Sequence, residues 1–333
     1  MKAIMQPLAG LAEFQEIRKS LYASPGIQLV TGCTQSQKMH FAAGLTQDSP
    51  VRLIIAENDL KAKELYEDYR LYDREVLFYP AKDLIFFQAD IQGNLLTKQR
   101  MRVVRALMER REATVITSIG GCMDHLLPLE FIRGQVLHLK NDSTVDLEEI
   151  KRKLIDLGYE RMPQVEQSGQ FSIRGGIIDI FSLTEENPWR IELWGEEVDS
   201  IRSFDVESQR SIENLDEIDV YPATEMVLTE TARERGIKAI QKEAKACIKK
   251  MRDQMMTEEA ARIRTSTEEI TEQLREEENY DGAQQYLHYF YPDTVSFLEY
   301  FPKDPPVILD ELNHISECAS ALELEFQESM THR

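Results

Sequence analysis

The chain has 333 residues, of which 42% are hydrophobic and 29% are charged, and its formal net charge is −20. This length and composition are typical of a globular protein with two or three domains. The acidic balance argues against a surface devoted to duplex DNA or to an anionic membrane, because both are bound by local positive charge.

Four cysteines and the absence of long apolar runs place further limits. Cys33, Cys122, Cys247 and Cys318 are far apart and show no metal-ligand spacing, so we expect neither a zinc site nor a disulfide framework. No stretch has the pattern of a secretion signal or of a membrane span. We therefore expect a cytoplasmic protein that has no membrane partner.

The chain is predicted to begin with a helix and then a strand, a loop and a second helix. Apolar residues at helical spacing predict an amphipathic helix over residues 8–23. A short strand is predicted over residues 27–31, and a helix leaves the following loop and runs to about residue 45.

The loop at residues 32–39 nearly matches the phosphate-binding pattern GxxxxGK[ST]. Gly32 and Lys38 fit, but Gln37 replaces the second glycine and Met39 replaces the hydroxyl residue that would ligate magnesium. Glycine is needed where the backbone closes on phosphates, and a thioether is a poor ligand for a hard cation. We expect no ATP hydrolysis here. The spacing alone favours a strand-to-helix turn without a ligand, while the helix N-terminus leaves weak anion binding open.

Strands and helices alternate over the next part of the chain. We predict strands at residues 50–57, 76–79 and 114–118, and helices at residues 60–72 and 95–109. This alternation predicts an α/β fold with a parallel sheet covered on both faces. Lys98, Arg102 and Arg105 are most simply a solvated face of the second helix, with nucleic-acid binding as the alternative.

The character of the sequence changes near residue 134. A capping box at Asp146 and Glu149 begins a helix that Gly158 ends, and alternating residues then predict strands to about residue 222. These features predict a small α+β domain inserted after the α/β unit. Residues 228–284 are highly charged at helical spacing and predict two antiparallel helices.

A last buried strand, at residues 305–309, ends in Asp310 and Glu311. In an ATPase, an acidic pair at the end of this strand binds a water ligand of the metal ion and polarises the attacking water. A structural role for two acids at a strand end is equally compatible with the sequence.

Residues 158–181 combine the strongest strand signal with an unusual surface composition. Arg161 and Arg174 flank a predicted turn, and Phe171 lies close to the second arginine. Arginine and aromatic side chains dominate protein interfaces, so this stretch indicates a partner-binding hairpin. The spacing alone favours the plainer alternative, a solvated strand face with ordinary surface arginines.

Together, these segments resemble the amino-terminal part of the bacterial transcription-repair coupling factors (Mfd), a part that is similar to the excision-repair protein UvrB. The resemblance runs from about residue 8 to about residue 314. It is carried by the degenerate loop, PVRLIIAENDLKAKELYEDY, TKQRMRVVRALMERREATVITS, GQFSIRGGIIDIFS, DSIRSFDVESQRS and VILDE.

The resemblance implies four parts. Residues 1–134 would form a P-loop helicase-like sheet domain, 135–227 an inserted UvrA-binding domain, 228–284 a helical domain, and 285–333 a segment that completes the first sheet. The inactive nucleotide site would comprise Gly32, Gln37, Lys38, Met39, Asp310 and Glu311.

The resemblance also implies a partner. Arg161 and Arg174 fall on positions whose counterparts contact UvrA, and Phe171 lies beside the second. Ser172 is a departure, because UvrB has an arginine there. The sequence between residues 79 and 95 is too short for the aromatic hairpin that UvrB inserts between DNA strands.

The implied function is a non-catalytic module that binds UvrA and recruits nucleotide excision repair to stalled RNA polymerase. The family continues with parts that bind RNA polymerase and with a DNA translocase that uses ATP and magnesium, so we expect a fragment that itself needs no cofactor. A distant domain masks this surface in full-length members, which implies autoinhibition through an intramolecular contact. The alternatives are a working ATPase that uses Lys38, Asp310 and Glu311, or a UvrB-like DNA-binding protein.

Overall fold

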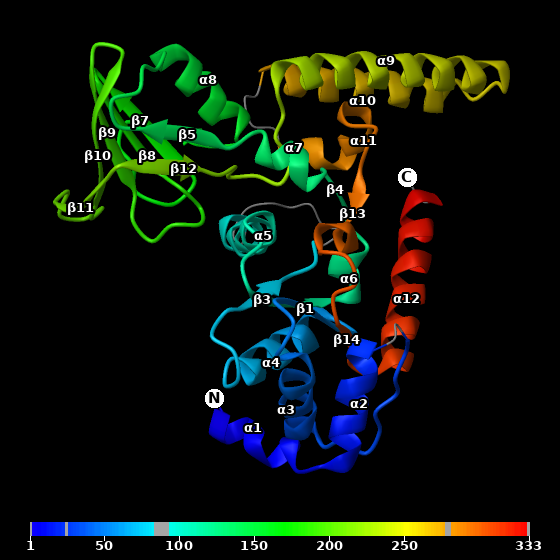
Figure 1. Cartoon of the computed structure of the whole chain (residues 1–333). Coiled ribbons are helices and arrows are strands. Elements are labelled where there is room, and N and C mark those ends of the chain that lie inside the picture. Colours follow the sequence, from blue (N-terminus) through cyan, green and yellow to red (C-terminus); the bar gives the residue numbers. More distant parts are fainter. Residues whose placement is uncertain (1, 24–25, 83–92, 277–280, 332–333) are drawn as a thin grey trace. The chain divides into compact units, whose positions relative to one another are not determined.

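A computed structural model describes residues 2–23, 26–82, 93–276 and 281–331 (Figure 1). The chain divides into two compact units. The first comprises residues 1–88, 102–125 and 296–333, and the second comprises residues 89–101 and 126–295. The predicted inserted domain and the predicted helical domain both fall within the second unit.

A four-stranded parallel sheet of order β14-β1-β3-β2 forms the centre of the first unit. Its strands are β1 (Val51–Ala56), β2 (Val76–Tyr79), β3 (Ala113–Ser118) and β14 (Val307–Leu309). The register aligns Ile54 with Ile116 on one side and with Ile308 on the other. All six residues of β3 are buried, as expected for a parallel strand that is covered on both faces. The α/β class and the parallel sheet predicted from the alternation are therefore confirmed.

The helices of this unit are α1 (Lys2–Ala9), α2 (Ala12–Ala23), α3 (Gln35–Thr46), α4 (Asp59–Tyr69), α6 (Ile119–Cys122) and α12 (Leu312–Thr331). A further helix, α5 (Gly93–Met108), is divided between the two units after Met101. Two short helices, α1 and α2, replace the single helix predicted over residues 8–23, because the chain turns between Ala9 and Ala12. Leu8 and Phe14 then pack at Gly44 of α3, where an added Cβ would lie 2.7 Å from the Leu8 Cδ1 atom. The close approach of these helices therefore requires a glycine.

The strand predicted at residues 27–31 does not form. Ile27 is 101% exposed and Leu29 is 82% exposed, and β14 pairs only with β1 among the described residues. A strand is stabilised by pairing with a neighbour, and the apolar pattern alone does not supply that neighbour. A phosphate-binding turn was predicted as a strand, a loop and a helix. Only the loop and the helix α3 form.

A six-stranded sheet of order β11-β10-β9-β8-β7-β6 forms the centre of the second unit. Its strands are β6 (Glu160–Arg161), β7 (Gln170–Arg174), β8 (Ile177–Phe181), β9 (Trp189–Trp194), β10 (Glu197–Phe204) and β11 (Ser211–Leu215). The pairs are antiparallel except β6 with β7, which is parallel. A two-stranded sheet of β5 (Leu137–Lys140) and β12 (Glu217–Val220) and the helix α8 (Leu147–Asp156) complete this α+β part.

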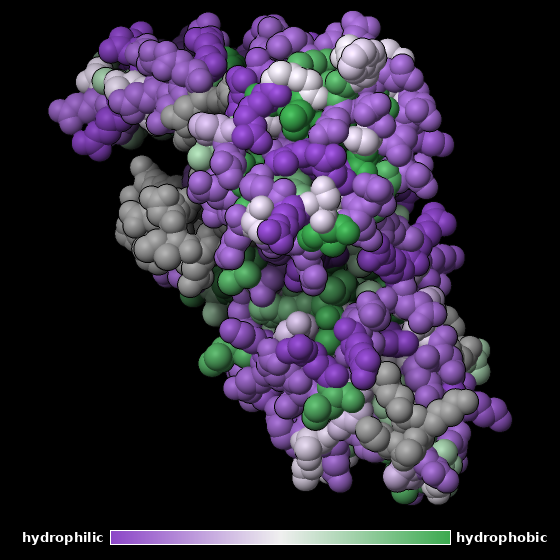
Figure 2. Space-filling model, turned by 90° about the vertical axis from the view of Figure 1, so that its left-hand side faces the viewer, coloured by the Kyte–Doolittle hydropathy of each residue, from purple (hydrophilic) through white to green (hydrophobic). Residues whose placement is uncertain are grey.

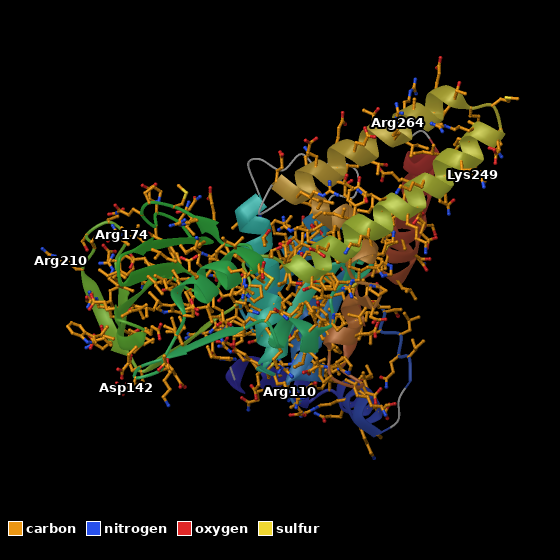
Figure 3. All side chains as sticks on the ribbon, turned by 90° about the horizontal axis from the view of Figure 1, so that it is seen from above. Arg110, Asp142, Arg174, Arg210, Lys249 and Arg264 are labelled. Carbon is orange, nitrogen blue, oxygen red and sulfur yellow. The ribbon has the colours of Figure 1, made fainter. Side chains whose placement is uncertain are left out.

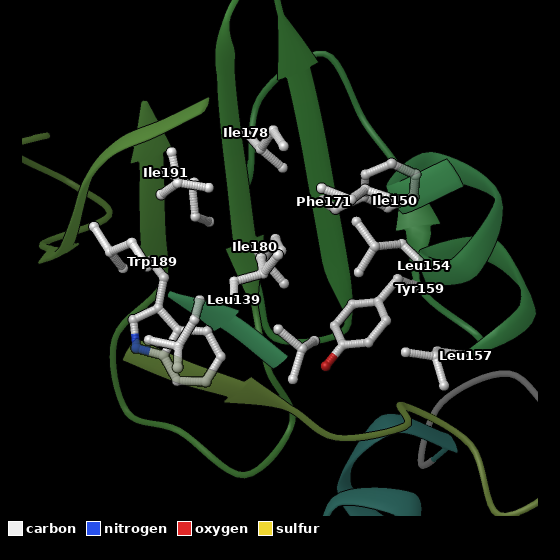
Figure 4. Packing of buried hydrophobic residues seen from close by; sticks show 14 of the residues in the cluster. Leu139, Ile150, Leu154, Leu157, Tyr159, Phe171, Ile178, Ile180, Trp189 and Ile191 are labelled. Atoms are coloured by element: carbon white, nitrogen blue, oxygen red, sulfur yellow. The ribbon is translucent and has the colours of Figure 1, made fainter. Parts of the chain in front are cut away.

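One face of the six-stranded sheet packs on α8 and on the small sheet (Figure 4). Asp146 caps α8 by accepting hydrogen bonds from the backbone of Glu148 and Glu149, which is the N-cap half of the predicted capping box. Ile150 and Leu154 of α8 are buried in the core. The Tyr159 hydroxyl donates to the Tyr221 carbonyl at 2.7 Å, so the one polar group of that ring is satisfied inside the cluster.

Two long helices, α9 (Glu230–Asp253) and α10 (Thr257–Glu276), form an antiparallel hairpin, as predicted from the helical spacing (Figure 1). Gly236 allows α9 to approach the short helix α11 (Leu287–Phe290) closely, because an added Cβ would lie 2.1 Å from the Phe290 ring. The remaining short elements are β4 (His125–Leu126), α7 (Leu129–Arg133), η1 (Asp281–Tyr286), α11 (Leu287–Phe290), β13 (Val295–Ser296) and η2 (Phe297–Tyr300).

Polar side chains cover most of the face seen in Figure 2, and hydrophobic side chains form small separate patches there. Of the helices within the described ranges, none combines the length and the hydropathy that a bilayer span needs. In the same ranges, no three potential metal-ligating side chains gather at one place.

Candidate functional site

The six-stranded sheet has a core face and an outer face, because side chains alternate along each strand. The register pairs Phe171 with Ile180 and Ile173 with Ile178, and these side chains point into the core. Arg174 pairs with Ile177, and its side chain therefore belongs to the outer face. Phe171 and Arg174 are three residues apart and so project from opposite faces.

Phe171 is a core residue. It is 0% exposed and lies against Ile150 and Leu154 of α8 (Figure 4). The prediction that its ring belongs to an exposed partner-binding patch is corrected by this burial. The aromatic ring stabilises the sheet and is not available at the surface for a partner.

Arg174 is held in place by a buried carboxylate. Its side chain is 48% exposed, and its Nη2 donates to Asp179 Oδ2 at 2.9 Å. Asp179 is only 2% exposed and also accepts from Arg190 Nε at 2.7 Å and from Arg190 Nη2 at 2.8 Å. Hydrogen bonds to Asp179 raise the pKa of Arg190 against the opposing effect of burial.

This three-residue network carries a net positive charge, since two guanidinium groups share one carboxylate. Among the described residues only the Nη2 group of Arg174 is engaged, so its other N–H donors can meet an external acceptor. Figure 3 shows Arg174 at the margin of the sheet. The arrangement can present a preoriented cation to a carboxylate on a partner protein.

Arg161 is exposed on the edge strand β6. The register pairs it with Phe171, and the Glu160 and Gln170 side chains contact each other at 3.3 Å on the opposite face. Because side chains alternate along a strand, the Arg161 side chain projects from the face opposite to that of Arg174. The structure brings the two predicted arginines to the same margin of the sheet, formed by β6 and β7, but not onto one flat patch.

Asp179 was not among the residues predicted from the sequence. Its signal was a single acid inside the apolar strand Ile177–Phe181, because a charged side chain in a buried strand requires a partner.

In the degenerate loop at residues 32–39, side chains of the loop itself take the places that a phosphate or a metal would need. The Thr34 backbone N–H at the start of α3 donates to Gln37 Oε1 at 2.9 Å. Gln37 stands where the pattern has a glycine. Its side chain therefore takes up one of the backbone N–H groups at the helix N-terminus. Met39 is 2% exposed and packs in the core of the first unit, so its thioether is buried among apolar side chains. Gly32 has a φ of 82°, which suits glycine.

Lys38 is engaged by the two acids that follow β14. Its Nζ donates to Asp310 Oδ1 at 2.9 Å, and it also donates to Glu311. Burial acts to lower the pKa of Lys38, but hydrogen bonds with Glu311 and Asp310 raise it overall. The hydrogen bond from Lys38 lowers the pKa of Glu311. We call Lys38, Asp310 and Glu311 the lysine clasp.

Asp310 is the buried member of the lysine clasp. Its side chain is 4% exposed, and its Oδ2 has no hydrogen-bond partner among the described residues. Lys38 is 22% exposed and Glu311 is 56% exposed. The ammonium group that would face phosphates is therefore already neutralised by carboxylates of the same unit.

Comparison with known proteins gives two results. Residues 137–226, which contain the six-stranded sheet and α8, match the family described as the UvrB interaction domain. The chain is 33% identical over 324 residues to the transcription-repair-coupling factor of Bacillus subtilis strain 168, covering 96% of this chain and 27% of that protein. It is 32% identical over 304 residues to that of Staphylococcus aureus strain Mu50, covering 89% of this chain and 25% of that protein.

Part of the second unit is therefore similar to the UvrB interaction domain. The chain is a relative of the transcription-repair-coupling factors and fits their UvrB-like amino-terminal module, so the resemblance seen in the sequence motifs is confirmed. It spans about a quarter of the length of the curated relatives that it matches.

Proposed function

We propose that this chain is a non-catalytic recruitment module that binds UvrA through the margin of its six-stranded sheet. In a longer protein it would thereby deliver nucleotide excision repair to a stalled RNA polymerase. The observation that supports this best is a half-exposed Arg174, fixed by buried Asp179, inside a UvrB interaction domain.

The physical basis is a charge pair at a protein interface. Arg174 is preoriented, so it loses little side-chain entropy when it meets a carboxylate on UvrA. Exposed Arg161 adds a second positive charge from the other side of the same margin. Removing one partner of a desolvated interfacial charge pair costs about 2–5 kcal/mol.

Calorimetric titration of UvrA with wild-type chain and with Arg174→Glu tests this proposal. We expect saturable binding for the wild type and a loss of at least about 30-fold in affinity for the variant. Arg264→Glu on α10 is the matched control, because it changes the charge by the same amount on an exposed helix (Figure 3). Equal binding by Arg174→Glu and by Arg264→Glu would refute the assignment.

We also propose that the lysine clasp and the loop at residues 32–39 are structural, so that this chain uses no ATP and no magnesium. Gln37 and Met39 fill the places of the glycine and the metal ligand, and Lys38 is engaged by Asp310 and Glu311. The alternative is a working ATPase. A phosphate-release assay separates the two: we expect no release above background, and release that Lys38→Ala abolishes would establish the ATPase.

DNA binding by this chain has less support. Arg105 donates to Glu109 at 2.7 Å, so a basic residue that could face a phosphate is already paired along its own helix. We assign contacts with DNA and RNA polymerase to the remainder of a longer protein.

We further propose that a distant domain of such a protein covers the UvrA-binding surface by an intramolecular contact. Higher affinity of this chain than of the longer protein for UvrA supports that contact, and equal affinity contradicts it.

A further inference from the structure

An exposed tryptophan shares the outer face of the six-stranded sheet with Arg174. The chain has two tryptophans. Trp189 is 7% exposed in the core, whereas Trp194 at the other end of β9 is 79% exposed. Tryptophan is strongly buried on average, and it is enriched among the residues that dominate protein interfaces. A ring left this open on a sheet is a candidate for burial by a partner.

Trp194 belongs to the outer face of the sheet, like Arg174. Trp189 and Ile191 point into the core, so alternation directs Arg190 and Trp194 outward. Across the strands, Arg174 pairs with Ile177, and Ile177 pairs with Glu192. Trp194 follows Glu192 by two residues and so occupies the next position along this face.

The turn after Arg174 contacts β9 next to Trp194. The Leu193 N–H donates to the Gly176 carbonyl at 2.7 Å, which places the turn that follows Arg174 against the backbone beside Trp194. A Cβ on Gly176 would lie 2.9 Å from the Leu193 carbonyl oxygen, so this contact depends on a glycine. The Gly175-Gly176 pair therefore does more than end β7, because its turn contacts the end of β9 that carries Trp194.

We propose that Trp194 is the aromatic anchor of the partner-binding surface and that it acts together with Arg174. This inference rests on the proposed function and adds to it a residue and a description of the complementary site. The site on UvrA would be an apolar pocket for the indole, with a carboxylate on the side that meets Arg174.

The charged residues around Trp194 determine how a partner would be oriented on this surface. Asp179 is already shared by Arg174 and Arg190, and Glu192 is bonded to Arg202 at 2.5 Å, so neither acid satisfies the free donors of Arg174. On the far side of Trp194, Glu196 and Glu197 are exposed on the turn into β10. Cationic groups on the partner would therefore lie on that side of the pocket. These acids also make an anionic membrane an unsuitable partner for the indole.

The first test is calorimetric titration of UvrA with Trp194→Ala. We expect affinity to fall by about 30-fold or more, the effect of truncating an interface hot spot, with an unchanged circular dichroism spectrum because the ring is exposed. The matched control is Leu60→Ala on α4, which truncates a side chain that is 73% exposed in the other unit and should bind as the wild type does.

The second test measures burial of the indole directly. Replacing both tryptophans by 5-hydroxytryptophan allows this chain to be excited selectively in the presence of UvrA. We expect acrylamide to quench Trp194 readily in the free chain and much less in the complex. A Trp194→Phe chain retains only Trp189 and should show little quenching in either state.

The outcomes separate this inference from the proposed function. Loss of binding in both Trp194→Ala and Arg174→Glu, together with protection of the indole, supports both. Loss in Arg174→Glu alone, with Trp194→Ala binding normally and its indole still accessible, overturns the inference and leaves the proposed function standing. Absence of binding by the wild type overturns both.

Discussion

Removal of the Lys38 ammonium should loosen the contact between α3 and β14. In Lys38→Met the alkyl part of the side chain is retained, but Asp310 loses its hydrogen-bond donor while it remains 4% exposed. The Oδ2 atom of Asp310 already lacks a partner among the described residues, so the variant would leave a buried carboxylate without compensation.

The expected magnitude follows from the burial of the pair. Breaking a fully buried ion pair costs about 3–5 kcal/mol. Lys38 is 22% exposed, so water can partly solvate the site, and we expect about 2–3 kcal/mol. The double variant Lys38→Met/Asp310→Asn should recover part of this loss, because it removes the charge that the single variant leaves buried.

Hydrogen exchange measured by mass spectrometry reports this loss of stability for individual segments of the chain. Amides of α3 and β14 should exchange about 30- to 150-fold faster in Lys38→Met, which is the same free energy expressed as a ratio. Lys63→Met on α4 is the control, because it removes a positive charge from an exposed position of the same unit. Unchanged exchange at α3 and β14 would refute a structural role for the lysine clasp.

Three further predictions concern the core, acid stability and thiol reactivity. Phe171→Ala should destabilise the second unit by about 3–5 kcal/mol, because it opens a cavity; urea unfolding followed by the fluorescence of buried Trp189 measures this, and an unchanged midpoint would place the ring outside the core. The pKa of Glu311 is lower in the folded chain than its ordinary value of 4.5, so the unfolded state binds more protons and stability is lost as pH falls through this window. Urea midpoints at about pH 3 to 6 should therefore depend less on pH in Glu311→Gln than in the wild type. Burial, with a contribution from Asp124, raises the pKa of Cys122 to about 12, so its thiol should resist a disulfide reagent at about pH 8 until the chain is unfolded; rapid reaction in the native chain would contradict its burial.

The spacing of apolar residues correctly predicted the helices and strands whose burial follows a regular pattern along the sequence. The Val- and Ile-rich strands β1 and β3 and the charged helices α9 and α10 are examples, because a parallel sheet and a helical hairpin each impose a regular pattern on the sequence. The strand predicted at residues 27–31 has an equally apolar pattern, but no neighbouring strand pairs with it in the described structure. Pairing depends on segments that are distant in sequence, and periodicity does not report them.

The candidate site was only partly predictable for a related reason. Alternation itself separates Phe171 from Arg174, since an odd spacing within one strand places two side chains on opposite faces. The residues that share the outer face with Arg174 are harder to predict from the sequence. Asp179, Arg190 and Trp194 come from two other strands, and only the register of the sheet brings them to the same face.

The central claim, that this chain offers UvrA a UvrB-like surface, is tested most directly by titrating UvrA with the chain before and after UvrA has been saturated with UvrB. We predict saturable binding to free UvrA and none to the UvrA–UvrB complex, because both ligands would use the same site. No binding to free UvrA, or binding of equal affinity in the presence of UvrB, would contradict it.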